Sequence, residues 1–144
     1  MRLAEAMGRS VVARDSAETI GAVHGAVVDV ASRRIVALQV GKGNKARLAD
    51  WTSLTGVGPD AAVIDREASL RAPSGDREER VVKGDIALLG GLVLSDRGDA
   101  LGSLRDVEFD ESTGEVITLV CEDTEIAASR LRSVGSYAVV VGGP

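Results

Sequence analysis

An internal repeat constrains the fold of this chain more than any other feature. Gly21 and Gly102 lie 81 positions apart, and the same spacing relates many other residues. The matched pairs are Val12 and Val93, Asp15 and Asp96, Ile20 and Leu101, Val23 and Leu104, Val28 and Phe109, Asp29 and Asp110, Ile35 and Val116, Val36 and Ile117, and Leu38 and Leu119. Self-similarity at a fixed spacing marks a duplicated structural unit. The chain is therefore predicted to contain two copies of one small fold.

The first copy has the pattern of short strands separated by polar turns. Valine-rich runs alternate with turn-forming segments at residues 14–19 and 41–45, which is typical of β-structure. Asp50 is predicted to cap a helical turn that carries Trp51 and Leu54. The predicted strands are residues 10–13, 20–30, 34–40, 47–49 and 61–64.

The second copy repeats this order with a late loop that is four residues shorter, because Leu54 matches Leu131 at a spacing of 77. Ser129 is predicted to cap the helical turn that holds Leu131 and Val134. The predicted strands are residues 87–94, 101–109, 115–121, 125–127 and 137–141. The fold class predicted for the whole chain is therefore all-β.

A charged segment separates the two copies. Residues 66–81 contain eight charged residues, Pro73 and Gly75, with little apolar periodicity, as domain linkers do. The predicted organisation is a first repeat over residues 1–66, a linker over residues 67–81 and a second repeat over residues 82–144.

Composition indicates the compartment. The single Cys cannot form an internal disulfide, which favours a reducing environment. No apolar run reaches the roughly 18 residues that span a membrane. The first ten residues lack the continuous apolar stretch of a signal peptide. A cytoplasmic location without a membrane span is expected.

The long second strand of each copy is predicted to contain a β-bulge. Leu104 and Val107 both look buried, although their odd spacing places them on opposite faces of a regular strand. A bulge near Arg105 would restore the phase. His24 and Gly25 lie at the matching positions of the first copy, and glycine suits a bulge. We expect His24 and Arg105 to point outward.

The third strand of each copy is apolar on both faces. Residues 34–40 and 116–121 both show this pattern, which is typical of a strand buried on both sides. A small barrel needs only one apolar face for its interior. The second face is expected to pack against the sister repeat or another subunit, and the sister repeat is favoured because it is always present at high effective concentration.

These elements resemble the PRC-barrel family, named for the H subunit of the photosynthetic reaction centre. The resemblance rests on IGAVHGAVVDVASRRIVALQV and LGSLRDVEFDESTGEVITLV, and on the endings DWTSLTGVGPDAAVI and ASRLRSVGSYAVVV. It covers both repeats, and it implies two tandem, strongly bent β-barrels of about six strands each. The family's members are not enzymes. They dock onto partners in the reaction centre, in ribosome maturation and in archaeal cell division.

No catalytic, cofactor-binding or metal-binding residue is predicted. His24 has no nucleophile and orienting partner of the kind that a catalytic triad requires. Cys121 ends a strand at the position of Val40 and is expected to be a packed thiol. Asp106, Glu108 and Asp110 alternate along one strand; they would suit a hard cation such as Ca²⁺, but a solvated strand face is the favoured interpretation.

Charge is distributed unequally between the halves. Residues 1–66 carry a net charge of +2 and residues 67–144 a net charge of −7. Direct binding of nucleic acid is disfavoured, since the chain is acidic overall and has few aromatic residues for base stacking. A basic surface on the first repeat and an acidic strand on the second are the predicted protein-binding sites. They comprise Arg33, Arg34, Lys42, Lys45 and Arg47 in the first repeat and Asp106, Glu108 and Asp110 in the second.

The sequence therefore predicts a non-enzymatic adaptor that needs no cofactor and docks onto a larger protein complex. Two alternatives stay open. The first is an accessory factor in ribosome or RNA maturation that binds a ribosomal protein. The second is a self-assembling structural protein in cell division or at a membrane surface, in which complementary charges join copies head to tail.

Overall fold

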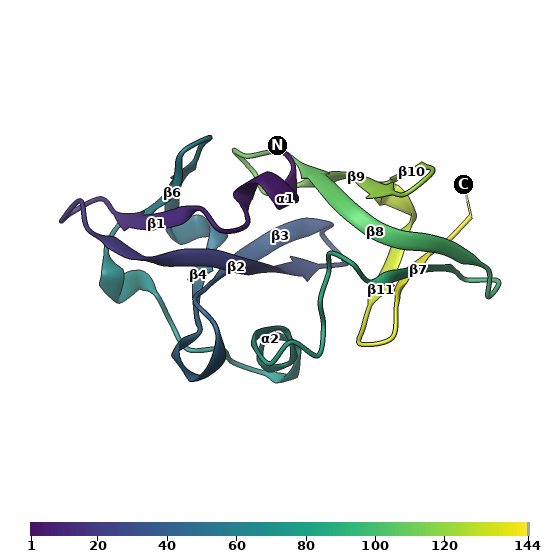
Figure 1. Cartoon of the computed structure of the whole chain (residues 1–144), viewed down its shortest axis with the longest axis horizontal. Helices are drawn as coiled ribbons and strands as arrows, with labels where there is room; N and C mark the ends of the chain where they lie inside the picture. Colours follow the sequence, from purple (N-terminus) through teal and green to yellow (C-terminus); the bar gives the residue numbers. More distant parts are fainter. Residues whose placement is uncertain (144) are drawn as a thin grey trace.

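The structure is a computed structural model that describes residues 1–143 (Figure 1). The first repeat folds into a six-stranded sheet. The strand order is β4-β3-β2-β1-β6-β5, and β1 and β6 form the one parallel pair of this sheet within the described residues. The strands are β1 (Ser10–Ala13), β2 (Thr19–Asp29), β3 (Arg34–Val40), β4 (Arg47–Asp50), β5 (Leu54–Val57) and β6 (Ala61–Ile64).

The second repeat forms a sheet with the equivalent order, β10-β9-β8-β7-β12-β11. The parallel pair is now β7 and β12. The strands are β7 (Leu92–Ser95), β8 (Ala100–Phe109), β9 (Val116–Cys121), β10 (Glu125–Ala127), β11 (Leu131–Val134) and β12 (Val139–Val141). The two orders coincide when six is added to each strand number of the first sheet. The prediction of an all-β chain is confirmed, and the strand order follows the 81-residue repeat.

Each sheet is open. In the first sheet, β4 and β5 are the terminal strands; the 3₁₀ turn η2 (Trp51–Ser53) joins them, and they are not hydrogen-bonded neighbours. In the second sheet, β10 and β11 are related in the same way by η4 (Ala128–Arg130). The closed barrels implied by the family resemblance are not found within residues 1–143.

The predicted helical turns are three-residue 3₁₀ helices that lead directly into strands. Leu54, which was expected on the first turn, begins β5 and pairs with Ile64 of β6. Leu131 begins β11 and pairs with Val141 of β12. Strand pairing satisfies more backbone groups than an isolated helical turn does, so the chain extends as soon as a partner strand is present.

The predicted side-chain caps of these turns are wrong. Asp50 precedes η2 but makes no cap hydrogen bond, because its carboxylate accepts hydrogen bonds of 2.9–3.1 Å from the Arg71 guanidinium. A charge-assisted pair of this kind is stronger than a bond to a neutral backbone amide. Ser129 lies inside η4, one residue beyond its first position, and therefore cannot cap it.

The strand predicted over residues 87–94 begins only at Leu92. Gly90 adopts a left-handed φ of +86°, which interrupts an extended strand. The amide of Gly90 donates to the carbonyl of Leu104 at 2.7 Å, and the amide of Leu104 donates to the carbonyl of Gly91 at 2.8 Å. The residues before Gly90 are thereby directed towards the first repeat.

The predicted bulges are confirmed. The register between β2 and β3 shifts between Val23 and Gly25, and that between β8 and β9 shifts between Leu104 and Asp106. His24 and Arg105, the skipped residues, are both exposed.

The linker contains a helix that covers the outer face of the first sheet. Helix α2 (Asp76–Val82) follows the short turn η3 (Glu67–Ser69) and lies beneath β2 (Figure 1). Its Val81 packs with Ile86 into a separate apolar cluster whose sheet residues are Val27, Ala37 and Leu48. The prediction that the sister repeat covers this face of β3 is wrong, because the linker covers it.

The same face of the second sheet has no such cover. The positions equivalent to Val27, Ala37 and Leu48 are Glu108, Thr118 and Glu125. These three positions are therefore polar, and Ile117 of β9, the equivalent of Val36, is 50% exposed. The prediction that β9 is buried on both faces is wrong.

The two repeats join along an approximate two-fold axis. Arg34 and Glu115, which are equivalent residues, form an antiparallel bridge. The Ile35 amide donates to the Gly114 carbonyl at 2.8 Å. The Val116 amide donates to the Arg33 carbonyl, also at 2.8 Å. Each hydrogen bond is the symmetry equivalent of the other, as in an isologous dimer contact.

Side chains from both repeats form the main core. The buried cluster includes Val11 and Leu38 of the first repeat and Leu104 and Phe109 of the second. The short N-terminal helix α1 (Leu3–Ala6) lies beside β8 and so adds a segment of the first repeat to the second (Figure 1). No helix within residues 1–143 is long and apolar enough to cross a membrane.

Candidate functional site

A groove lined by basic side chains lies on the first repeat beside α2. We call it the basic groove and define it by His24, Lys42, Arg47 and Lys83, with Ala46 and Val81 among its apolar lining. Lys42 lies just before the short turn η1 (Gly43–Lys45), Arg47 begins β4, and Lys83 directly follows α2 as its C-cap. The hairpin end and the linker helix together therefore build a surface that neither would form alone.

The positive charge of the groove is not neutralised within the chain. No ion pair among the described residues includes Lys42, Arg47 or Lys83, and no carboxylate lines the groove. Lys45, also predicted as a binding residue, is exposed on η1 and forms no ion pair within residues 1–143. Cations that share a concave surface concentrate the field and attract anionic groups.

Arg71 holds one wall of the groove in place. Its backbone pairs with Leu48 through hydrogen bonds of 2.8 and 3.0 Å, and its guanidinium binds Asp50 and Glu78 at 2.7–3.1 Å. The hydrogen bonds from Arg71 lower the pKa of Glu78, and both carboxylates raise the pKa of Arg71. Residue Pro73 of the groove wall directly follows this network. The linker is thus fixed to the edge of β4.

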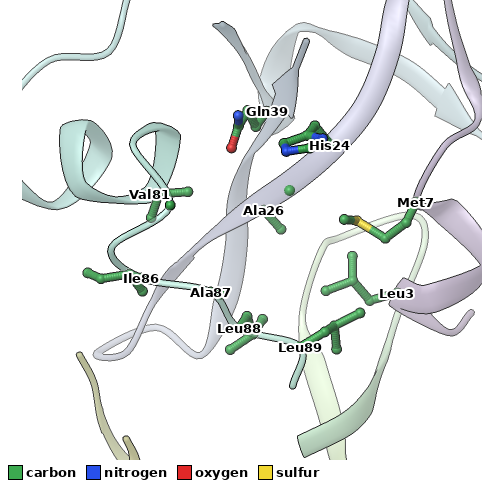
Figure 2. Close-up of a pocket in the computed structure, with 12 residues that line it drawn as sticks. Leu3, Met7, His24, Ala26, Gln39, Val81, Ile86, Ala87, Leu88 and Leu89 are labelled. Atoms are coloured by element: carbon green, nitrogen blue, oxygen red, sulfur yellow. The ribbon is translucent and has the colours of Figure 1, made fainter. Parts of the chain in front are cut away.

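An apolar pocket adjoins the basic groove. Figure 2 shows its lining, in which Leu3 and Met7 face Leu88 and Leu89 of the segment before β7. The cavity has a volume of about 140 Å³. His24, Val81 and Gly84 line both the pocket and the groove. A ligand in one is therefore in reach of the other.

Gln39 is the buried polar side chain of this pocket. It is 2% exposed, and its Nε2 donates to the Gly41 carbonyl at 3.0 Å. Within residues 1–143 no group donates a hydrogen bond to its Oε1. A Cβ atom on Gly25 would lie 3.0 Å from that oxygen, so the glycine leaves room beside it. The amide oxygen is an unused acceptor at the polar end of an apolar pocket.

The structure separates the basic residues that the sequence grouped together. Arg33 directly precedes β3 and Arg34 begins it, whereas Lys42, Lys45 and Arg47 follow its end. An Nη2 of Arg33 donates to the Ser129 carbonyl and an Nη1 of Arg34 donates to the Thr113 carbonyl, both at 3.2 Å. These two arginines belong to the junction between the repeats.

The predicted acidic strand is engaged by its own chain. Asp106 accepts hydrogen bonds from the amides of Ala4 and Val107, at 2.9 and 2.8 Å. Glu108 forms a backbone bridge with Arg2. The carboxylate of Asp110 accepts bonds from the hydroxyl and amide of Ser112 and from the amide of Thr113, which lower its pKa. Among the described residues, no three His, Cys, Asp or Glu side chains are grouped to hold a metal ion.

Cys121 is buried and unpaired, as predicted for a packed thiol. Burial raises its pKa, and the neighbouring charge of Glu122 adds to this effect. The thiol is therefore poorly suited to nucleophilic chemistry.

Several residues of this site were missed at the level of sequence. Gln39 is the one amide in the otherwise apolar strand RIVALQV, and this irregularity was an available signal. Lys83 lies just beyond the segment interpreted as a linker, where no pattern predicted a helix that would carry it to the groove.

Comparison with known proteins does not identify the chain. No protein-family model matches it, and no curated protein is significantly similar to it.

Proposed function

We propose that this chain is a non-enzymatic docking module of the PRC-barrel type, which binds an acidic segment of a protein partner in its basic groove. The observation that carries the proposal is the group of cations Lys42, Arg47 and Lys83 around one concave surface, without a carboxylate partner in the described part of the chain. Solvated cations that serve only solubility are usually interspersed with acids. An acidic ligand would supply the missing opposite charge.

The charge and shape favour a protein ligand over nucleic acid. No Phe, Tyr or Trp side chain lines the groove, and the ring of Trp51 packs edge-on against Phe109 with centroids 6.0 Å apart. Single-stranded nucleic acids are bound largely by stacking on aromatic rings. The net charge of −5 also opposes long polyanions, whereas a short acidic peptide contacts only the groove.

Self-association is the second candidate, because the second repeat carries most of the negative charge. The hydrogen bonds already accepted by Asp106 and Asp110 within the chain make their strand a poorer partner for the groove. A role in ribosome or RNA maturation stays an alternative that the same experiment addresses.

The test is affinity capture from a lysate of the source organism at about 50 mM and about 300 mM salt, since screening weakens exposed charge contacts. Lys42→Glu, Arg47→Glu and Lys83→Glu are compared with Arg97→Glu, which makes the same charge change at an exposed turn of the second repeat. We expect a partner that is lost at high salt and with each groove variant but is retained by Arg97→Glu. Cross-links from the amines of Lys42 or Lys83 to an acidic segment of the partner would locate that segment in the basic groove.

Three results would contradict the proposal. A partner retained by all three groove variants would place docking elsewhere. Capture abolished by nuclease would favour the RNA alternative. Recovery of the bait alone, with a larger species in light scattering that dissociates with salt, would favour self-assembly.

A further inference from the structure

We infer that the apolar pocket beside the basic groove receives one aliphatic side chain of the docked acidic segment. The ligand class is then an extended peptide with a leucine-sized anchor flanked by Asp or Glu. This inference rests on the proposed docking function and adds a specificity determinant to it.

The size of the pocket sets the size of the anchor. Its volume of about 140 Å³ is close to that of a cavity of about 150 Å³ that binds one benzene molecule. One branched aliphatic side chain fills such a space, whereas a long acyl chain does not fit. The walls formed by Leu3, Met7 and Leu88 match an apolar group (Figure 2).

Gln39 indicates that the anchor belongs to a peptide. Its side chain is almost completely buried, but its Oε1, which receives no hydrogen bond from residues 1–143, keeps some accessible surface in the pocket. An amide oxygen in this position is free to accept a hydrogen bond from a ligand. The backbone N–H beside the anchor residue would supply the donor, as ligand pockets commonly combine apolar walls with a few placed polar groups.

The continuity of pocket and groove sets the position of the acidic residues. Val81, Gly84 and the exposed His24 line both depressions. An extended chain advances about 3.3 Å per residue, so residues flanking the anchor run directly onto the groove. Carboxylates at these positions would face Lys42 and Arg47.

The second repeat does not offer a copy of this pocket. Asp106 replaces Gly25 and binds the Ala4 amide, while Val120 replaces Gln39. A carboxylate side chain therefore stands where the first repeat has none, and the amide acceptor is replaced by an apolar side chain. One peptide per chain is expected.

The test measures the fluorescence anisotropy of labelled peptides with the full chain. The probes are Glu-Asp-Glu-Leu-Glu-Asp-Glu, the same peptide with Gly in place of Leu, and a Leu peptide with Gln and Asn in place of the acids. We expect the acidic Leu peptide to bind about tenfold more tightly than the Gly peptide, the discrimination typical of one aliphatic side chain. The uncharged peptide should bind much more weakly than either.

Two variants assign this preference to the pocket. Gly25→Ala places a methyl group against Gln39, at a φ that does not require glycine, and Gln39→Val removes the acceptor and copies the second repeat. Each should reduce the preference for Leu to about twofold or less while the salt-dependent binding of both acidic peptides persists. Val120→Thr, at the position of Gln39 in the second repeat, should leave the preference unchanged. A photo-leucine anchor should cross-link to residues of the pocket.

The outcomes separate the inference from the proposed function. Equal binding of the acidic Leu and Gly peptides, with both lost in Lys42→Glu, would overturn the pocket assignment and leave the docking groove supported. Displacement of the Leu peptide by octanoate at a lower concentration than by unlabelled peptide would assign the pocket to a free carboxylic acid instead. Failure of every peptide to bind at about 1 mM would overturn the inference. The capture experiment would still test docking independently.

Discussion

Arg34 and Glu115 occupy equivalent positions in the two repeats and face each other in one antiparallel bridge. The hydrogen bonds on either side of them, Ile35 to Gly114 and Val116 to Arg33, have the same length of 2.8 Å. A contact in which each element meets its own equivalent is the intramolecular form of an isologous dimer interface. The duplication therefore has a structural result. The β2–β3 hairpin of the first repeat pairs with the equivalent β8–β9 hairpin of the second.

Gly114 is closely packed at this junction. We predict that Gly114→Ala lowers the free energy of unfolding by about 3 kcal/mol, because a strained φ and a steric clash both contribute. Its φ is +77°, and a Cβ atom there would lie 2.7 Å from the Ile35 carbonyl and 3.0 Å from the Trp51 ring. Urea unfolding followed by the fluorescence of Trp51, the single tryptophan, measures the loss.

Gly98→Ala is the matched control for this prediction. Gly98 also lies in a strand reversal, with a φ of +92°, but nothing lies within 4 Å of a Cβ atom there. Gly98→Ala should lower the free energy of unfolding by about 1–2 kcal/mol, the penalty of the left-handed backbone alone. Equal losses in the two variants would show that close packing at the junction does not matter.

The Arg71 network makes stability depend on pH. Glu78 has a pKa below its ordinary value of 4.5, chiefly because of the hydrogen bonds from Arg71. Its contribution is therefore present above about pH 4.5 and is lost as the pH falls through the lower folded value. We predict that Glu78→Gln costs about 1–3 kcal/mol at pH 7 and much less at about pH 3.

The measurement is urea unfolding of the wild type and of Glu78→Gln across this pH range. Glu67→Gln, an exposed glutamate of the same linker without an ion pair among the described residues, should change stability by less than about 0.5 kcal/mol. A loss in Glu78→Gln that stays constant down to about pH 3 would assign its effect to packing and not to charge.

The repeat and the bulges were predictable because they are local patterns of apolar spacing. The equivalence of the two strand orders followed from the duplication, and the outward positions of His24 and Arg105 followed from strand phase. Helix α2 was not predictable, since its seven residues contain five charges and its stability comes from Val81 docking on a distant sheet face. For the candidate site, Lys42 and Arg47 were found by their charge. Lys83 and Gln39 join them only through tertiary contacts.

The outer sheet faces provide a test of the linker as a cover. Leu48 has no exposed surface beneath α2, while its equivalent in the second repeat is the exposed Glu125. We predict that Leu48→Ala costs about 2–5 kcal/mol through lost burial and the cavity that remains. Glu125→Ala should change stability by less than about 0.5 kcal/mol. Chemical unfolding of both variants measures the two free energies. Similar small losses of stability in both would mean that α2 does not cover this face.

Cys121 provides a chemical probe of whether the two repeats unfold together. Its side chain is 4% exposed in the main core, which contains residues of both repeats, and burial raises its pKa. Reaction with Ellman's reagent at about pH 8 should therefore be slow in the native chain, since only the exposed thiolate attacks.

We predict that the rate of this reaction rises with urea in step with the fluorescence change of Trp51, which lies at the junction with Phe109. Coincident transitions are expected because one core unfolds cooperatively. Reaction at low urea, before any change in fluorescence, would show that the second sheet opens separately, and Cys121→Ser serves as the unreactive control.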